Sequence, residues 1–124
     1  MIHLILVETI IEDSEHYEYF LTLNDGMFRL NCCTHRGEFL PGTEFDNEIS
    51  AYGLENIYKI ASNKPFISVH ESSGKQHIHA KVIDTLERIV QVGAYKIWLL
   101  ENVIPKDILD GDFIEFDVDC LVIY

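Results

Sequence analysis

Short runs in which apolar and polar residues alternate recur along the chain, and this pattern constrains the fold more than any other feature. In the stretch FIEFDVDCLVIY (113–124), apolar residues alternate with Glu115, Asp117 and Asp119. Successive side chains of a β-strand point to opposite faces, so such a stretch forms a strand with one apolar face and one acidic face. We therefore expect a β-sheet protein whose strands bury one face each.

Nine such runs, separated by turn residues, predict a mainly β fold. The Asn-Asp-Gly sequence at 24–26 predicts a tight hairpin between two of them, because a positive φ costs little there. Gly-Ala at 93–94 and Ser-Ser-Gly at 72–74 predict two more hairpins. The expected strands cover residues 2–11, 17–23, 27–33, 43–51, 66–70, 76–84, 86–92, 95–101 and 113–124.

One segment, YGLENIYKIASNK, has helical spacing instead. Leu54, Ile57 and Ala61 recur at intervals of three and four residues, and a proline follows the segment. Apolar residues at these intervals lie on one face of a helix, and proline cannot continue one. We predict a short helix over residues 53–62.

The length of 124 residues fits a single domain that buries about two-thirds of the surface of its unfolded chain. FLPGTEFDNEI resembles ILDGDFIEFDVDCL, which favours two similar halves, 1–62 and 63–124. A chance match between Gly-turn-strand segments explains the similarity equally well. We expect one domain, 1–124, built as a barrel or as a two-sheet sandwich of about nine strands.

Acidic residues outnumber basic ones, 21 Asp and Glu against 9 Lys and Arg, for a net charge of −12. The excess is concentrated in three segments: residues 1–28 and 37–58 contain no Lys or Arg, and residues 101–124 contain only Lys106. Such a charge repels nucleic acid and anionic membranes and attracts basic proteins. We expect no direct binding to nucleic acid or membranes.

Two of these segments carry acids at alternate positions of an expected strand: Glu44, Asp46 and Glu48 in the first acidic ladder, and Glu115, Asp117 and Asp119 in the second. Outward-facing charge keeps a strand soluble and prevents edge-to-edge pairing, which is one explanation. A surface that attracts a basic partner is the other, because a partner would relieve the repulsion between the acids. Tyr17 and Tyr19, interleaved with acids, would support such a contact or pack in the core.

The segment FISVHESSGKQHIHAKVI contains His70, His77 and His79. Pairing Val69 with Gln76 places all three histidines on the outer face of a hairpin. Three imidazoles could hold Zn²⁺ with a fourth position open, but the H-x-H spacing is a weak signal and nearby lysines oppose a cation. A solvent-facing histidine strand is the alternative, and we predict no metal or other cofactor.

Cys32, Cys33 and Cys120 are odd in number, and the first two are neighbours on an expected strand. We expect three core cysteines without a disulfide framework, as in a reducing compartment. The first residues lack the basic region and cleavage site of a signal peptide, so we expect a cytoplasmic protein. No motif of a common catalytic or nucleotide-binding family occurs, so we expect no enzyme.

Together these features predict a non-enzymatic immunity or inhibitor protein that neutralises a basic partner such as a nuclease toxin. Its contact residues would be the two acidic ladders, with Tyr17 and Tyr19 in support. A phage-type DNA mimic that blocks a restriction or CRISPR nuclease is an alternative in the same chemical class. A metal-dependent hydrolase using His70, His77 and His79, or a structural module of a larger assembly, are alternatives from other classes.

Overall fold

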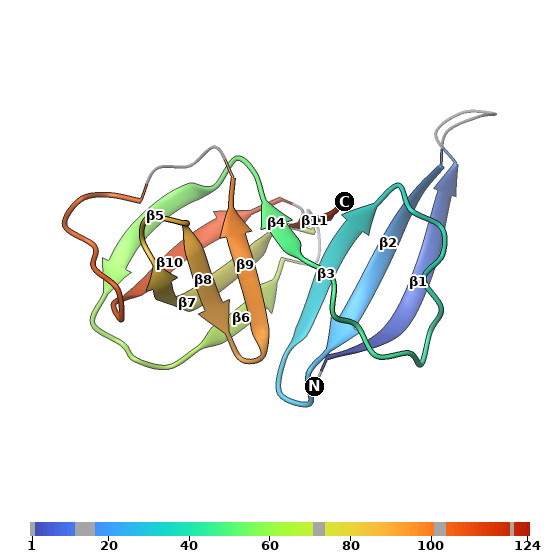
Figure 1. Cartoon of the computed structure of the whole chain (residues 1–124), viewed down its shortest axis with the longest axis horizontal. Coiled ribbons are helices and arrows are strands. Elements are labelled where there is room, and N and C mark those ends of the chain that lie inside the picture. Colours follow the sequence, from blue (N-terminus) through green and yellow to red (C-terminus); the bar gives the residue numbers. More distant parts are fainter. Residues whose placement is uncertain (1, 12–16, 71–73, 101–103, 120) are drawn as a thin grey trace.

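The computed structural model describes residues 2–11, 17–70, 74–100, 104–119 and 121–124 (Figure 1). These residues form eleven strands and no helix, which confirms the mainly β prediction. Accordingly, none of these segments is a helix that could cross a membrane. The strands are β1 (His3–Ile11), β2 (Tyr17–Asn24), β3 (Arg29–Thr34), β4 (Ile49–Ala51), β5 (Glu55–Ile60), β6 (Phe66–Val69), β7 (Gln76–Asp84), β8 (Ile89–Val92), β9 (Tyr95–Leu99), β10 (Phe113–Val118) and β11 (Leu121–Ile123).

All eleven strands belong to one mixed sheet. β1, β2 and β3 form an antiparallel meander at the right of Figure 1, and β9, β8, β7, β10 and β5 form an antiparallel series at the left. β11 and β4 join the two groups, since β11 pairs in parallel with β3 and β4 pairs in parallel with β9. β1 and β5 lie at opposite ends of this order, so the sheet is not closed and the expected barrel closure is not seen.

The central strand of the left-hand group is β7, and three strands pair with it. β10 lies along one edge of β7, with Glu115 opposite His79 and Asp117 opposite His77. The other edge is divided, because β6 pairs with the first half of β7 and β8 pairs with the second half. The first half of β7 is therefore fixed from both sides by backbone hydrogen bonds.

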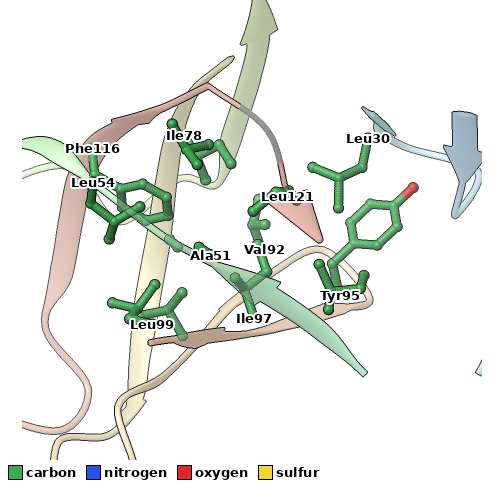
Figure 2. Close-up of a cluster of buried hydrophobic side chains, with 14 of the residues drawn as sticks. Leu30, Ala51, Leu54, Ile78, Val92, Tyr95, Ile97, Leu99, Phe116 and Leu121 are labelled. Carbon is green, nitrogen blue, oxygen red and sulfur yellow. The ribbon is translucent and has the colours of Figure 1, made fainter. Parts of the chain in front are cut away.

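The alternation along β7 and β10 decides which side chains enter the core. Ile78 on β7 and Phe116 on β10 are fully buried, whereas the intervening residues point outward. Figure 2 shows Leu30 and Leu121 beside Tyr95, and Phe116 beside Leu54. Side chains from both groups of strands therefore meet in one hydrophobic core.

The predicted helix over residues 53–62 is wrong, because this segment contains β5, an edge strand paired with β10. The pairing slips between Glu115 and Asp117, and Asn56 adopts a φ of 57° at the slip. This is a β-bulge, in which one extra residue interrupts the alternation. The bulge lets Leu54 and Ile57 both pack on the core although they lie three residues apart, which is also the spacing of a helix.

The predicted strand over residues 43–51 is also too long, since only Ile49–Ala51 forms β4. The preceding residues form no strand, although Glu44 makes an isolated bridge to His3. Phe45 is nonetheless buried, and its backbone N–H donates to the carbonyl of Ile2 at 2.8 Å. The alternation of apolar and acidic residues in this segment therefore reflects the burial of Phe45 and does not mark a continuous strand.

The hairpins predicted at 24–26 and 93–94 are both present, joining β2 to β3 and β8 to β9. Asp25 links them, because its carboxylate accepts hydrogen bonds from Met27 and Phe28 in its own turn and from Ala94 in the other. The third predicted hairpin falls partly on residues 71–73, outside the described residues. The strands beside it pair as predicted, with Val69 opposite Gln76.

Cys32 is a buried free thiol, as expected for a core cysteine, and burial raises its pKa. Cys33 is disulfide-bonded. The expectation of no disulfide is therefore wrong at Cys33. Cys120 itself lies outside the described residues.

Candidate functional site

The outer faces of β7 and β10 bring histidines and carboxylates together. Both strands bury their even-numbered residues, so His77 and His79 on β7 point to the same side as Glu115 and Asp117 on β10. The register places each histidine directly opposite one acid, at the separation where cross-strand side chains touch. We call these four residues the histidine–carboxylate cluster.

Three atoms of the cluster lie at nearly equal distances from one another. Nε2 of His77 and Nε2 of His79 are 3.0 Å apart. Oε2 of Glu115 is 3.5 Å from the first nitrogen and 3.4 Å from the second. All three side chains are partly buried, with 24–35% of each side chain exposed. Described His, Cys, Asp and Glu residues form no other group of three that could hold a metal ion.

Asp117 fixes the orientation of His77. Its Oδ1 accepts a 2.6 Å hydrogen bond from Nδ1–H of His77, and its Oδ2 accepts one of 2.8 Å from the side-chain amide of Asn56. The hydrogen bonds from Asn56 and His77 lower the pKa of Asp117, because both stabilise the ionised carboxylate. The β-bulge of β5 therefore has a local role, since it places Asn56 beside this acid.

A lysine beside the cluster is itself held by carboxylates. Nζ of Lys75 lies 2.9 Å from Glu55 and 3.8 Å from Asp119. The hydrogen bond to Glu55, with the charge of that residue, raises the pKa of Lys75. The ammonium charge of Lys75 is thus offset locally by these two carboxylates.

The cluster borders a hollow of about 470 Å³ on the outer face of the sheet. His77 and Asp117 form one side of it, and Ser68, His70 and Lys75 contribute further polar groups. His70 thus faces the hollow but does not belong to the group of three close ligand atoms. The predicted trio of histidines is therefore divided, with His77 and His79 together and His70 apart.

Sequence reasoning missed the contribution of Glu115 and Asp117 to a histidine site. The sequence pattern places both acids in a partner-binding ladder and both histidines on a separate hairpin. The alternation of apolar and polar residues along each strand does predict that all four side chains point outward. What the sequence did not supply was the pairing of β7 with β10, which are separated by two intervening strands in the chain.

The other predicted contact residues lie elsewhere. Glu44, Asp46 and Glu48 are all exposed, on either side of the buried Phe45. Asp119 is 81% exposed, unlike the other acids of its ladder. Tyr19 is partly buried and packs on the core.

The side chain of Tyr17 lies outside the described part of the structure. Asp46 and Glu48 also border a smaller hollow of about 190 Å³, together with Lys96 and Trp98.

Comparison of the chain with models of protein families, with curated proteins and with solved structures finds no match. The chemistry of the residues is therefore the basis for any functional assignment. Two groups of described residues could carry a function. One is the set of exposed acids at 44–48, and the other is the histidine–carboxylate cluster, whose ring nitrogens and carboxylates face one another.

Proposed function

We propose that this protein is a non-enzymatic binding protein that neutralises a basic partner protein, of which a nuclease toxin is the leading example. The observation that carries the proposal is the exposure of Glu44, Asp46 and Glu48 on a protein with a net charge of −12. Complementary charge accelerates association and excludes acidic competitors.

The anchoring of this acidic segment supports the proposal. Phe45 is buried and packs against Phe39, with the ring centroids 5.8 Å apart and the rings tilted, so the backbone between the acids is tied to the core. A segment held in this way loses little conformational freedom when a partner binds, and less free energy is spent on ordering it. The three carboxylates can therefore act as a preformed surface.

The two acidic ladders are not equivalent as contact surfaces. Glu115 and Asp117 face His77 and His79, so a partner would have to displace these contacts to use them. Asp119 remains exposed, although Lys75 lies within 3.8 Å of it. We therefore assign the main contact to Glu44, Asp46 and Glu48, with Asp119 as an outlying member and with Tyr19 contributing through its exposed part only.

The same proposal places the protein in the cytoplasm, where an inhibitor would meet a toxin before it reaches its target. The disulfide at Cys33 counts against this location, because disulfides rarely persist in a reducing compartment.

The test is capture of partners from the native cell on the tagged protein, followed by calorimetry with the purified partner. The charge-reversal variant Asp46→Lys/Glu48→Lys should weaken binding at least ten-fold, equivalent to about 1.4 kcal/mol. The matched control Glu87→Lys/Asp107→Lys makes the same change of net charge at exposed positions elsewhere and should have a much smaller effect. High salt should weaken binding by the unmodified protein and should reduce the difference in affinity between the two variants.

Equal losses in the two variants would mean that net charge and not this surface governs binding. Failure to capture any basic protein at low salt would contradict the proposal itself. Capture of a restriction or CRISPR nuclease in place of a toxin would assign the DNA-mimic form of the inhibitor.

A further inference from the structure

We propose that His77, His79 and Glu115 form a binding site for a divalent transition-metal ion of the Zn²⁺ type. The proposal is independent of the acidic partner surface, because it uses none of the residues at 44–48. It rests on the geometry of three ligand atoms, on the support behind one of them, and on the charge around them.

The three atoms have the spacing that tetrahedral zinc requires. Zinc binds His nitrogen and carboxylate oxygen at about 2.0–2.2 Å, so neighbouring ligands in a tetrahedron lie about 3.3 Å apart. The observed separations are 3.0, 3.4 and 3.5 Å. An ion about 2.05 Å from all three atoms would lie about 0.7 Å out of their plane, as in a regular tetrahedron. No movement of the backbone is needed to form the site.

The support behind His77 is of the kind found at metal sites. An ionised carboxylate can only accept hydrogen bonds, so the 2.6 Å contact with Asp117 requires a proton on Nδ1 of His77. In the neutral ring, Nε2 then carries the lone pair, and this nitrogen faces His79 and Glu115. A carboxylate behind a metal-bound histidine sets the tautomer and raises the basicity of the ring. Asn56 in turn holds Asp117.

The surroundings favour a cation. Glu115 and Asp117 are each partly buried, which strengthens their attraction for a positive ion relative to exposed acids. The nearby ammonium of Lys75 is engaged by Glu55 and Asp119, so it offers little opposition. One of the lysines that opposed a metal in the sequence, Lys75, is thus paired with carboxylates in the fold.

The composition of the site selects the class of metal. Imidazole nitrogen suits zinc, iron, nickel and copper, whereas calcium and magnesium prefer ligand sets made of oxygen. Two nitrogens and one oxygen therefore favour a first-row transition metal. Three protein ligands leave the fourth tetrahedral position for water or another molecule, which is the arrangement of catalytic rather than structural zinc.

A metal-free explanation of the same contacts is available and makes the opposite prediction. One histidine Nε2–H can donate to the other ring, and a protonated histidine can pair with Glu115. A cluster held only in this way would show no selective affinity for zinc over magnesium. Titration with each metal separates the two explanations.

The experiment is calorimetric titration of the purified, chelator-treated protein with Zn²⁺, repeated with Mg²⁺. We expect one zinc per chain and no magnesium binding under the same conditions. His79→Gln and Glu115→Gln should each weaken zinc binding by at least 100-fold. Asp117→Asn, which changes only the support of His77, should weaken it by about 10- to 100-fold. The control His70→Gln alters a histidine of the adjacent hollow and should leave the affinity unchanged.

Absence of zinc binding, or zinc binding that His79→Gln leaves unchanged, would overturn the proposal. Equal losses in His70→Gln and His79→Gln would also overturn it, because the affinity would then belong to histidines in general. If a ligand variant does not fold, amide NMR of the unmodified protein decides the question. Zinc should shift signals of β7 and β10, and shifts confined to other strands would refute the site.

Discussion

Asp25 offers the sharpest test of how the sheet is held together, because one carboxylate joins two hairpins far apart in the sequence. Its Oδ1 accepts from the backbone N–H groups of Met27 at 2.9 Å and Phe28 at 2.7 Å, and its Oδ2 accepts from Ala94 at 2.8 Å. A Cβ on Gly93 would clash with that Oδ2, so the β8–β9 turn fits against the carboxylate only with glycine there. Nearby, the hydroxyl of Tyr95 donates to the carbonyl of Phe28 at 2.7 Å.

Replacing Asp25 with Ala removes all three hydrogen bonds. At about 1 kcal/mol net for each, the variant should lose about 3 kcal/mol of unfolding free energy, more than a typical surface substitution costs. Urea unfolding at neutral pH, followed by fluorescence or circular dichroism, measures this loss. The retained bond of Tyr95 should keep the fold intact.

The matched control is Asn24→Ala in the same turn. Asn24 accepts one exposed hydrogen bond, from the N–H of Gly26 at 3.0 Å, so its replacement should cost no more than about 1 kcal/mol. Similar losses in Asp25→Ala and Asn24→Ala would show that Asp25 acts only within its own turn. The link between the two hairpins would then contribute nothing to stability.

Two further predictions concern the hydrophobic core and the loss of stability at low pH. Phe116→Ala should lower the unfolding free energy measured in urea by about 3–5 kcal/mol, because this side chain is fully buried. Phe113→Ala changes an outward-facing residue of the same strand and should lower it much less. Equal losses in the two variants would refute the assignment of faces. The hydrogen bond from the N–H of Leu109 lowers the pKa of Asp112 below its ordinary 3.8, with help from Lys59. The stability that Asp112 contributes is therefore present above pH 3.8, the ordinary pKa of the group. It is lost as the pH falls through the lowered pKa of the folded protein. In the Asp112→Asn variant, the unfolding free energy should fall less steeply as the pH is lowered into the acid range. An unchanged pH dependence would contradict this reasoning.

Much of the strand pattern could be predicted because alternation is a local property of the sequence. β7 has the predicted limits, and the directions of His77, His79, Glu115 and Asp117 follow from period two. The split of the 113–124 run into β10 and β11 had no such signal. Turn chemistry also predicted the Asn24–Gly26 turn, where Gly26 adopts a φ of 93°.

The errors arose where tertiary contacts override local spacing. The bulge at Asn56 imitates helical spacing on a strand, so the interval between Leu54 and Ile57 could not distinguish the two. The candidate metal site depends on the register of β7 against β10, which residues distant in sequence determine together. Local pattern could orient each ligand but could not bring the ligands within 3.5 Å of one another.

The position of β11 has a consequence for how the protein reaches this structure. β11 is the last strand in chain order, yet it lies between β3 and β4 near the middle of the sheet. The β1–β2–β3 meander can form early from local contacts, but one edge of β3 stays open until β11 has been synthesised and docks there. An open strand edge recruits other chains, and long-range parallel pairing is slow. Aggregation during biosynthesis should therefore compete most strongly in the interval before β11 completes the sheet.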